Sequence, residues 1–462
     1  MRIKKKYIGY WYFHNDKDPV AGSLIVGNDI TLSLVDLNKK YYIQPDVPFL
    51  TGIVQDNNND VYFFILNNLI YTGSTINSQG LQTYKFQVDY IIYSTNRLLL
   101  EVPNHSLFTS EISIQSQFLN SWCERLIKEQ RYSVTTNMVD YHYINPSPIL
   151  ITELDYCNIF VAVNYSTRTP RYDGFFNKLE SFFIIKYFQP IEVKDCFGLI
   201  KQIEHFITLL ASIPFSNDTL TFKIEEIDCV CIQNIKIRHY NFSQTPNDYK
   251  STSSVVDVLD SQVFMHWIKF YEEESNALTL FFNTIYNEEL SDELRIICYS
   301  SVLEELTKRF FSSNKILPLT KRRKRLEHIV SILKSDNHLN EANDLKTGYL
   351  DKDETFEVRL LNLLQKYHDV WDLINIEEFA TKSVLTRNFL VHRQIQDKMA
   401  NYIYQQGEYN KLARILRYII SATLLKEIGY STDEVKRILT LLSSVWTYDD
   451  YIKVHPIQNT KT

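Results

Sequence analysis

Hydrophobic and polar positions follow two different periods along this chain. In the first half, apolar and polar residues alternate at 30–34 and 220–224, which is typical of half-buried strands. Apolar runs rich in β-forming residues, at 61–66 and 182–185, predict strands that are more fully buried. One stretch departs from this pattern, because the apolar residues of 197–210 recur every three or four positions. The first half therefore predicts a β-rich domain with one long helix.

In the second half the apolar residues recur at the helical spacing. The pattern predicts helices around residues 263–270, 294–310, 356–367 and 415–425. Ser431 is followed three residues later by Glu434, a spacing typical of a capping box that opens a further helix. The second half therefore predicts a helical bundle.

The two halves are separated by residues 243–254, which contain nearly no apolar side chain and predict a linker. We therefore expect an α+β multidomain protein whose first domain is sandwich-like. The expected division is a β-rich N-terminal domain at 1–242, a polar linker at 243–256, a helical bundle at 257–450 and a C-terminal tail at 451–462.

Composition and charge limit the class of protein that the sequence can encode. The net charge of −6 does not favour a broad basic surface that coats nucleic acid, so any RNA contact is expected to be local. No apolar run reaches the roughly 18 residues that cross a bilayer, and the N-terminus lacks the apolar core of a signal peptide. Six cysteines in so long a chain do not predict a disulfide framework. We expect a reduced cytoplasmic protein with no membrane contact and no cofactor, although Cys229 and Cys231 could supply two ligands to a metal.

The most informative local pattern is Arg387 and His392, five positions apart in a helical region. Arginine is permanently cationic and can clamp a phosphate, and histidine exchanges a proton near neutral pH. On a helix His392 shares a face with Asn388 and lies about 140° from Arg387, whose long side chain can curve back, especially at a helix start. Residues 389–391 are apolar and are expected to pack into the bundle and hold this turn rigid. Such a pair could cleave RNA without a metal.

The same residues also allow a structural interpretation, with a helix-start arginine and an interfacial histidine that do no chemistry. Arg323 and His328 share the spacing, but the cations at 321–325 are more simply a solvated or RNA-facing helix end. The spacing alone therefore leaves both interpretations open.

The order of these elements makes the chain similar to the ApeA family of bacterial anti-phage proteins, in which a β-rich domain precedes a HEPN domain. Arg387-Asn388-x-x-x-His392 resembles the Arg-x(4–6)-His signature of HEPN ribonucleases. Residues 301–306 resemble the family's apolar-Leu-Glu helix segment, which contains Glu304. The resemblance covers nearly the whole chain, and in the N-terminal half it rests on residues 9–13, 20–24, 30–34, 181–185 and 213–215.

This resemblance implies a metal-independent RNA endonuclease. His392 would take the proton of a ribose 2′-hydroxyl or give one to the 5′-oxygen, and Arg387 would stabilise the charge on the phosphorane. Asn388 would orient the phosphate or the histidine, and Glu304 is a candidate for an auxiliary polar role. HEPN domains generally dimerise with their signatures facing each other, so the resemblance implies a homodimer formed through the C-terminal domain.

Cations near the signature could form a local rim that binds phosphates, or they could be an ordinary charged helix face. They are Arg393, Lys398, Lys411, Arg414 and Arg417. The RNA could be tRNA, rRNA or mRNA, and the family role implies abortive infection, with the N-terminal domain sensing a phage-derived trigger or regulating the nuclease. Two alternatives stay open: an inactive HEPN-fold module that binds RNA or protein, and a β-sandwich ligand binder with a helical dimerisation domain.

Overall fold

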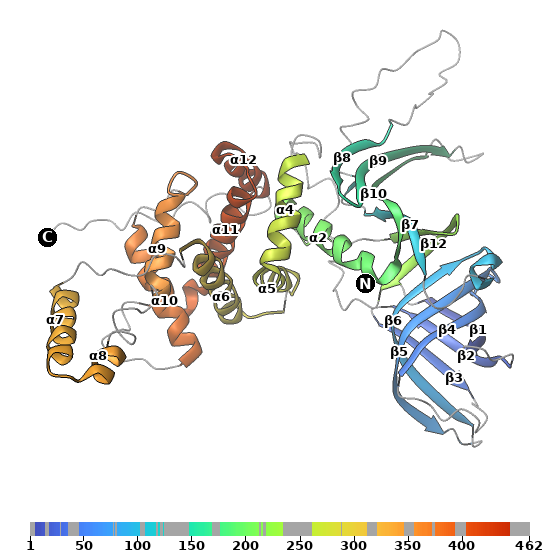
Figure 1. Cartoon of the computed structure of the whole chain (residues 1–462). Coiled ribbons are helices and arrows are strands. Elements are labelled where there is room, and N and C mark those ends of the chain that lie inside the picture. The colour runs from blue at the N-terminus through green and yellow to red at the C-terminus, as the bar shows by residue number, and fades with distance from the viewer. Residues whose placement is uncertain are drawn as a thin grey trace, which may run out of the picture. The chain divides into compact units, whose positions relative to one another are not determined.

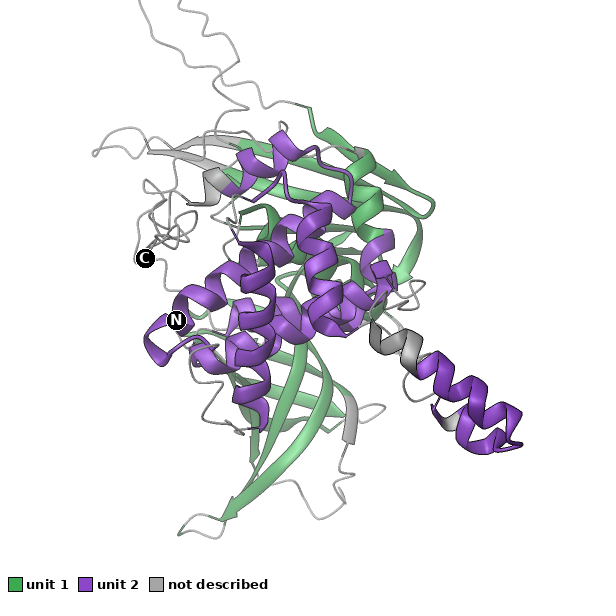
Figure 2. Ribbon diagram, turned by 90° about the vertical axis from the view of Figure 1, so that its left-hand side faces the viewer, with its two compact units in different colours: residues 1–268 green, residues 269–462 purple. Residues whose placement is uncertain are grey.

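The computed structural model of the chain divides into two compact units, Met1–Ile268 and Lys269–Thr462, which are described separately (Figure 2). The boundary between them falls inside helix α4 (Ser261–Glu273). The linker expected at 243–256 lies outside the residues that the structure describes, so the division at that segment stays a prediction. The described residues are 5–13, 18–27, 29–35, 46–76, 78, 81–101, 107–116, 119–120, 123, 147–168, 176–211, 214–215, 219–233, 261–287, 289–311, 321–345, 355–371, 375–392 and 403–443.

The first unit is built on one antiparallel sheet, which has twelve strands within the described residues (Figure 1). Alternating burial along β3 and β11 confirms the period-two pattern read from the sequence. The strands are β1 (Lys5–Phe13), β2 (Val20–Val26), β3 (Ile30–Val35), β4 (Asp46–Gln55), β5 (Val61–Ile76), β6 (Gln82–Ser94), β7 (Phe108–Gln115), β8 (Ile149–Leu154), β9 (Cys157–Arg168), β10 (Phe176–Glu192), β11 (Thr219–Ile224) and β12 (Ile227–Gln233).

The first six strands close into a barrel in the order β3-β2-β1-β4-β5-β6, because β6 also pairs with β3. Only the first half of β6 makes this closing contact, and its second half pairs with β12, which leads into the rest of the sheet. The barrel interior is a packed apolar core in which Trp11, Phe64 and Phe86 are fully buried. Gly52 lies so close to the Trp11 ring that a Cβ there would come within 2.4 Å of it. These aromatic side chains of the first half therefore form part of a hydrophobic core.

Beyond the barrel, the sheet continues in the order β12-β11-β7-β10-β9-β8, and helix α2 (Val193–Ala211) follows β10. The apolar stripe predicted for this helix is confirmed, and the helix is buried on all sides from 203 to 211. Burial, with a smaller effect from the Lys201 charge, lowers the pKa of His205 to about 3. His205 is therefore a neutral core residue near pH 7.

The start of α4 is anchored to the first unit. The indole Nε1 of Trp267 donates to the backbone oxygen of Gln202 at 2.9 Å, and Phe264 packs edge-on against Phe206 with ring centroids 5.1 Å apart. The helix predicted around 263–270 is confirmed.

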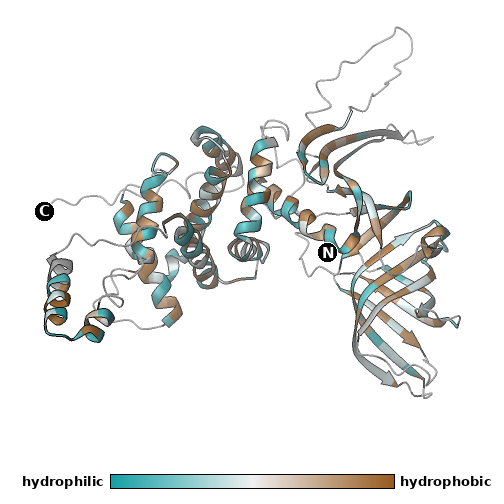
Figure 3. Ribbon diagram, in the orientation of Figure 1, coloured by the Kyte–Doolittle hydropathy of each residue, from teal (hydrophilic) through white to brown (hydrophobic). Residues whose placement is uncertain are grey.

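The second unit is helical, as predicted. Helix α6 contacts α5, α9, α10 and α11 and so forms the centre of the bundle. Bands of hydrophobic and hydrophilic residues alternate along the helices as they do along the strands (Figure 3). None of the helices in the described ranges is long and apolar enough to cross a membrane. The helices are α5 (Ser275–Tyr286), α6 (Asp292–Phe311), α7 (Lys321–Ser335), α8 (Leu339–Leu345), α9 (Phe356–Lys366), α10 (Ile376–His392), α11 (Tyr409–Glu427) and α12 (Thr432–Ser443).

The capping box predicted before the last helix is present. The backbone N–H of Glu434 donates to Ser431 Oγ at 3.3 Å, and the backbone N–H of Ser431 donates to Glu434 Oε2 at 2.8 Å. Each side chain thereby satisfies a donor that the helix start leaves unpaired.

Candidate active site

Helix α10 carries the three residues of the Arg387–His392 signature. Asn375 caps the start of the helix, since its Oδ1 accepts from the backbone N–H of Glu378 at 3.1 Å. The buried residues of α10 are Phe379, Ala380, Ser383, Val384 and Thr386. The buried face therefore ends one residue before Arg387, and the signature occupies the part of the helix that leaves the core.

This geometry corrects two expectations. Phe389 and Leu390 are only half-buried and Val391 is 42% exposed, so residues 389–391 pack into the bundle of this chain only in part. Three consecutive helical residues point in directions that span about 200°, so one core on one side cannot cover all of them. Arg387 is also not a helix-start arginine, because α10 begins at Ile376 and Arg387 lies in its C-terminal half.

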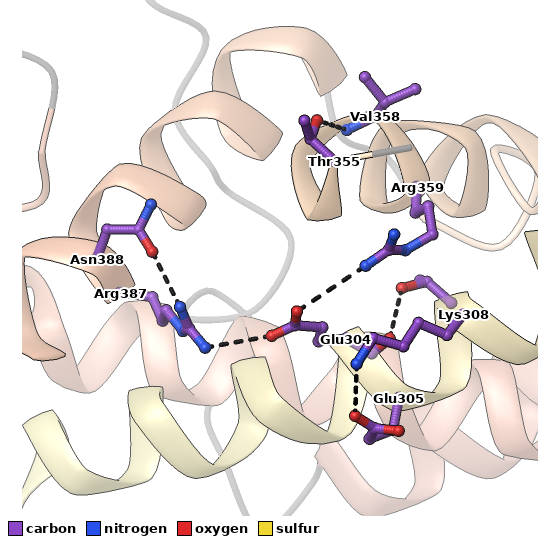
Figure 4. Close-up of polar contacts among 9 residues, drawn as sticks. Glu304, Glu305, Lys308, Thr355, Val358, Arg359, Arg387 and Asn388 are labelled. Atoms are coloured by element: carbon purple, nitrogen blue, oxygen red, sulfur yellow. Dashed lines mark hydrogen bonds and ion pairs between the residues drawn. The ribbon is translucent and has the colours of Figure 1, made fainter. Parts of the chain in front are cut away.

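Four side chains from three helices meet around Arg387 (Figure 4). Its Nη1 donates to Asn388 Oδ1 at 3.0 Å, and its Nη2 donates to Glu304 Oε2 of α6 at 3.2 Å. The other carboxylate oxygen of Glu304 lies 3.9 Å from Nη2 of Arg359, which α9 supplies. The Arg387 side chain thus contacts the neighbouring Asn388 and Glu304, and the expected approach of Arg387 to His392 stays a prediction.

The cluster carries two cations and one anion. Arg387 and Glu304 remain partly open to solvent, with 24% and 27% of their side chains exposed, whereas Arg359 is 7% exposed. The Nε of Arg387 is buried and has no hydrogen-bond partner among the described residues. The guanidinium is partly exposed and belongs to a cluster with one excess positive charge, so it can bind an anionic group such as a phosphate.

Three contacts hold α10 in the two turns that precede Arg387. The hydroxyl of Thr381 donates to Glu357 Oε1 of α9 at 2.6 Å. The hydroxyl of Thr386 accepts from the backbone N–H of Tyr404 at 2.9 Å, and Lys382 Nζ lies 4.4 Å from the centre of the Tyr404 ring. Tyr404 is therefore held beside Thr386, one residue before Arg387, and these contacts fix the part of α10 that leads into the signature.

His392 is the last residue of α10 and is exposed. It lies one turn beyond Asn388 on the same face of the helix. Among the described residues, hydrogen bonds join Arg387 to Asn388 and Glu304, and none joins His392 to that cluster. The imidazole is accessible to solvent and to a bound substrate.

Arg359 was not predicted from the sequence. It lies three residues after Phe356 and four before Leu363, which places it on the apolar face of the predicted helix. An arginine on a buried face requires a counter-charge or hydrogen bonds, and this was the signal that could have identified it.

The cations proposed for a phosphate-binding rim are only partly described. Lys411, Arg414 and Arg417 lie on α11, are half-buried, and each already takes part in an interaction within the protein. Arg393 and Lys398 lie outside the described residues. The rim stays a prediction.

Cys229 and Cys231 lie on the same buried face of β12, and burial raises the pKa of the Cys229 thiol to about 12. Within the part of the chain that the structure describes, no group of three or more His, Cys, Asp or Glu side chains is placed to hold a metal ion.

An N-terminal unit that contains a barrel, followed by a helical bundle with an Arg-x(4)-His helix, defines a two-part protein with a C-terminal HEPN domain. The family model described as Apea-like HEPN matches residues 298–434, which include Glu304, Arg359, Arg387 and His392. The model described as ApeA N-terminal domain 1 matches residues 6–259, more than half of the chain. The chain therefore belongs to the ApeA family, as its sequence predicted. No curated protein and no solved structure matches it.

Proposed function

We propose that this ApeA-family chain is an anti-phage RNA endonuclease in which Arg387 and His392 carry out the chemistry without a metal. The observation that supports this most is the Arg387 guanidinium, which Asn388 and Glu304 hold at the open side of a bundle matching the HEPN model. One turn further along the same helix, His392 is exposed and available as an acid or a base.

In the proposed reaction the 2′-oxygen of a ribose attacks the adjacent phosphorus while the bond from phosphorus to the 5′-oxygen breaks. His392 accepts the proton of the 2′-hydroxyl or returns one to the leaving 5′-oxygen. Arg387 stabilises the added negative charge on the phosphorane, and Asn388 holds the guanidinium in position. The products are a 2′,3′-cyclic phosphate and a 5′-hydroxyl end.

The remaining parts of the proposed function concern assembly and binding. A homodimer formed through the helical bundle would bring two signatures to one composite cleft, because a single exposed helix end offers few catalytic groups. Lys411, Arg414 and Arg417, with Arg393 and Lys398, would guide the phosphates of a tRNA, rRNA or mRNA toward it.

Residues 1–242 are proposed to sense a phage-derived trigger or to restrain the nuclease before infection. We expect the bundle alone, from about residue 257, to cleave RNA by the same chemistry as the full chain but to lose control by infection. The measurement compares growth and RNA integrity in cells that express either form, with and without phage. Identical behaviour before and after infection would leave the N-terminal domain without the proposed role.

The direct test of the proposed chemistry uses purified full-length protein and total cellular RNA in excess chelator. We expect cleavage to persist undiminished, because an arginine and a histidine supply the charge and the proton transfer that a bound metal would otherwise provide. Cleavage that stops in chelator and returns with added divalent cation would contradict this mechanism.

An inactive HEPN-fold module that binds RNA or protein is the second candidate. It is favoured by the described contacts of Arg387, which do not extend to His392. Full RNA binding without any cleavage by the purified protein would support that alternative.

A further inference from the structure

We propose that Arg359 is a positioning residue of this site, which retains the Glu304 carboxylate while Arg387 passes from that carboxylate to an RNA phosphate. The inference rests on the proposed function, since the phosphate is that of the RNA which Arg387 would bind. It assigns a role to a residue outside the Arg387–His392 signature.

The geometry that suggests this role is one carboxylate between two guanidiniums. Glu304 Oε2 accepts from Arg387 at 3.2 Å, and Glu304 Oε1 faces Arg359 at 3.9 Å (Figure 4). The first contact is a hydrogen-bonded ion pair, and the second is too long for a hydrogen bond. Glu304 is thus engaged by Arg387 and stands within a small movement of a bond to Arg359.

The difference in burial determines which of the two arginines can release the Glu304 carboxylate. Arg359 has 7% of its side chain exposed and is fixed inside the bundle on α9, whereas Arg387 is partly exposed at the end of the buried face of α10. A buried cation retains a counter-charge more strongly than an exposed one, because it is less solvated. When Arg387 turns to a ligand, Glu304 can close the gap to Arg359 and remain neutralised.

Two N–H donors of Arg387 could hydrogen-bond to one phosphate. Nε and Nη2 lie on the same edge of the guanidinium, and Glu304 uses only Nη2, while Nε has no hydrogen-bond partner among the described residues. A phosphate with two oxygens can accept from both donors at once, which a single carboxylate oxygen does not. Once Arg387 turns toward the ligand, the exchange therefore also pairs its Nε, a donor that is buried and unpaired in the free protein.

Without the charge of Arg359, only Arg387 would neutralise the Glu304 carboxylate. A phosphate that displaced this carboxylate from Arg387 would then leave it without a neighbouring cation. Arg359→Met should therefore weaken RNA binding, and Glu304→Gln should cancel that effect because the competing charge is gone. If Arg359 only stabilised the fold, Glu304→Gln would not be expected to restore RNA binding to the Arg359→Met protein.

The test uses the full-length chain carrying His392→Ala, so that RNA stays intact, and a fluorescently labelled single-stranded RNA whose affinity is measured by anisotropy. In this background Arg359→Met is expected to weaken binding about tenfold, and Arg359→Met with Glu304→Gln to bind within about twofold of Glu304→Gln alone. Arg309→Met is the matched control, because Arg309 also pairs with glutamates, Glu273 and Glu274, on the same unit. It should leave the affinity within about twofold of the background.

An Arg359→Met protein that binds RNA as tightly as the background, or a double variant as weak as Arg359→Met, would overturn the proposal. If Arg359→Met fails to fold, Glu304→Gln alone still decides: it removes the carboxylate that competes with the phosphate for Arg387, so it should bind RNA at least as tightly as the background, and weaker binding contradicts the proposal. A background protein that binds no RNA would overturn the proposed function together with this inference. Normal RNA binding that is insensitive to residue 359 would overturn only the inference.

Discussion

Replacing His392 or Arg387 by alanine is expected to abolish RNA cleavage and leave the fold intact. Loss of a general acid or base lowers a rate by about 10²–10⁴-fold, and loss of one charge-stabilising donor by about 10²–10³-fold. The fold should survive because His392 is exposed and Arg387 lies outside the buried face of α10. Removing Arg387 also leaves Glu304 beside the charge of Arg359. Single-turnover cleavage of a defined RNA measures the rates, and thermal melting checks the fold.

The control for these variants is His368→Ala, since His368 is an exposed histidine of the same unit that makes no described contact with the Arg387 cluster. It should cleave at the wild-type rate. Full activity in His392→Ala would refute the assigned chemistry, and loss of activity together with a lowered melting temperature would point to a structural role instead.

A charge placed at Val391 is expected to break the proposed homodimer and, with it, the activity. Val391 is 42% exposed, and Phe389 and Leu390 beside it are half-buried, so the last turn of α10 presents apolar side chains next to the signature. Burying these side chains against a second copy would favour association, and a buried unpaired carboxylate opposes it strongly. Val391→Glu should be monomeric at micromolar concentration in sedimentation velocity, with cleavage reduced more than about 100-fold.

Leu294→Glu provides the comparison, because Leu294 is 48% exposed on α6 and belongs to the same unit. The same change in charge at that position should leave both dimer and activity unaltered. A wild-type chain that is monomeric at this concentration yet fully active would show that one copy holds a complete site.

Local patterns in the sequence predicted many of the helices and some of the strands, because each pattern reflects the environment of its own segment. Alternation predicted β3 and β11, helical spacing predicted α2, α6, α9 and α11, and Ser431 with Glu434 predicted the start of α12. The closure of the barrel was not predictable in this way. It depends on pairs such as Thr31 with Gln87 in β3 and β6, and alternation in a strand does not specify its partner.

The candidate site was predicted in part for the same reason. The signature lies on one helix and is visible as a spacing, and Glu304 was identified through family resemblance. Its contact with Arg387 spans 83 positions and follows from how α6 and α10 pack. Arg359 appeared as a charge on the apolar face of a predicted helix, and its approach to Glu304 follows from the packing of α9 against α6.

Arg387 and His392 are proposed to cleave RNA through attack by the 2′-hydroxyl, which determines the chemical ends of the products. These ends can be identified after purified protein has acted on a defined RNA in excess chelator, with His392→Ala treated in parallel. We expect 2′,3′-cyclic phosphate and 5′-hydroxyl ends from the wild-type chain and intact RNA from the variant. Ends carrying a 3′-hydroxyl and a 5′-phosphate, or equal cleavage by both proteins, would contradict this proposal.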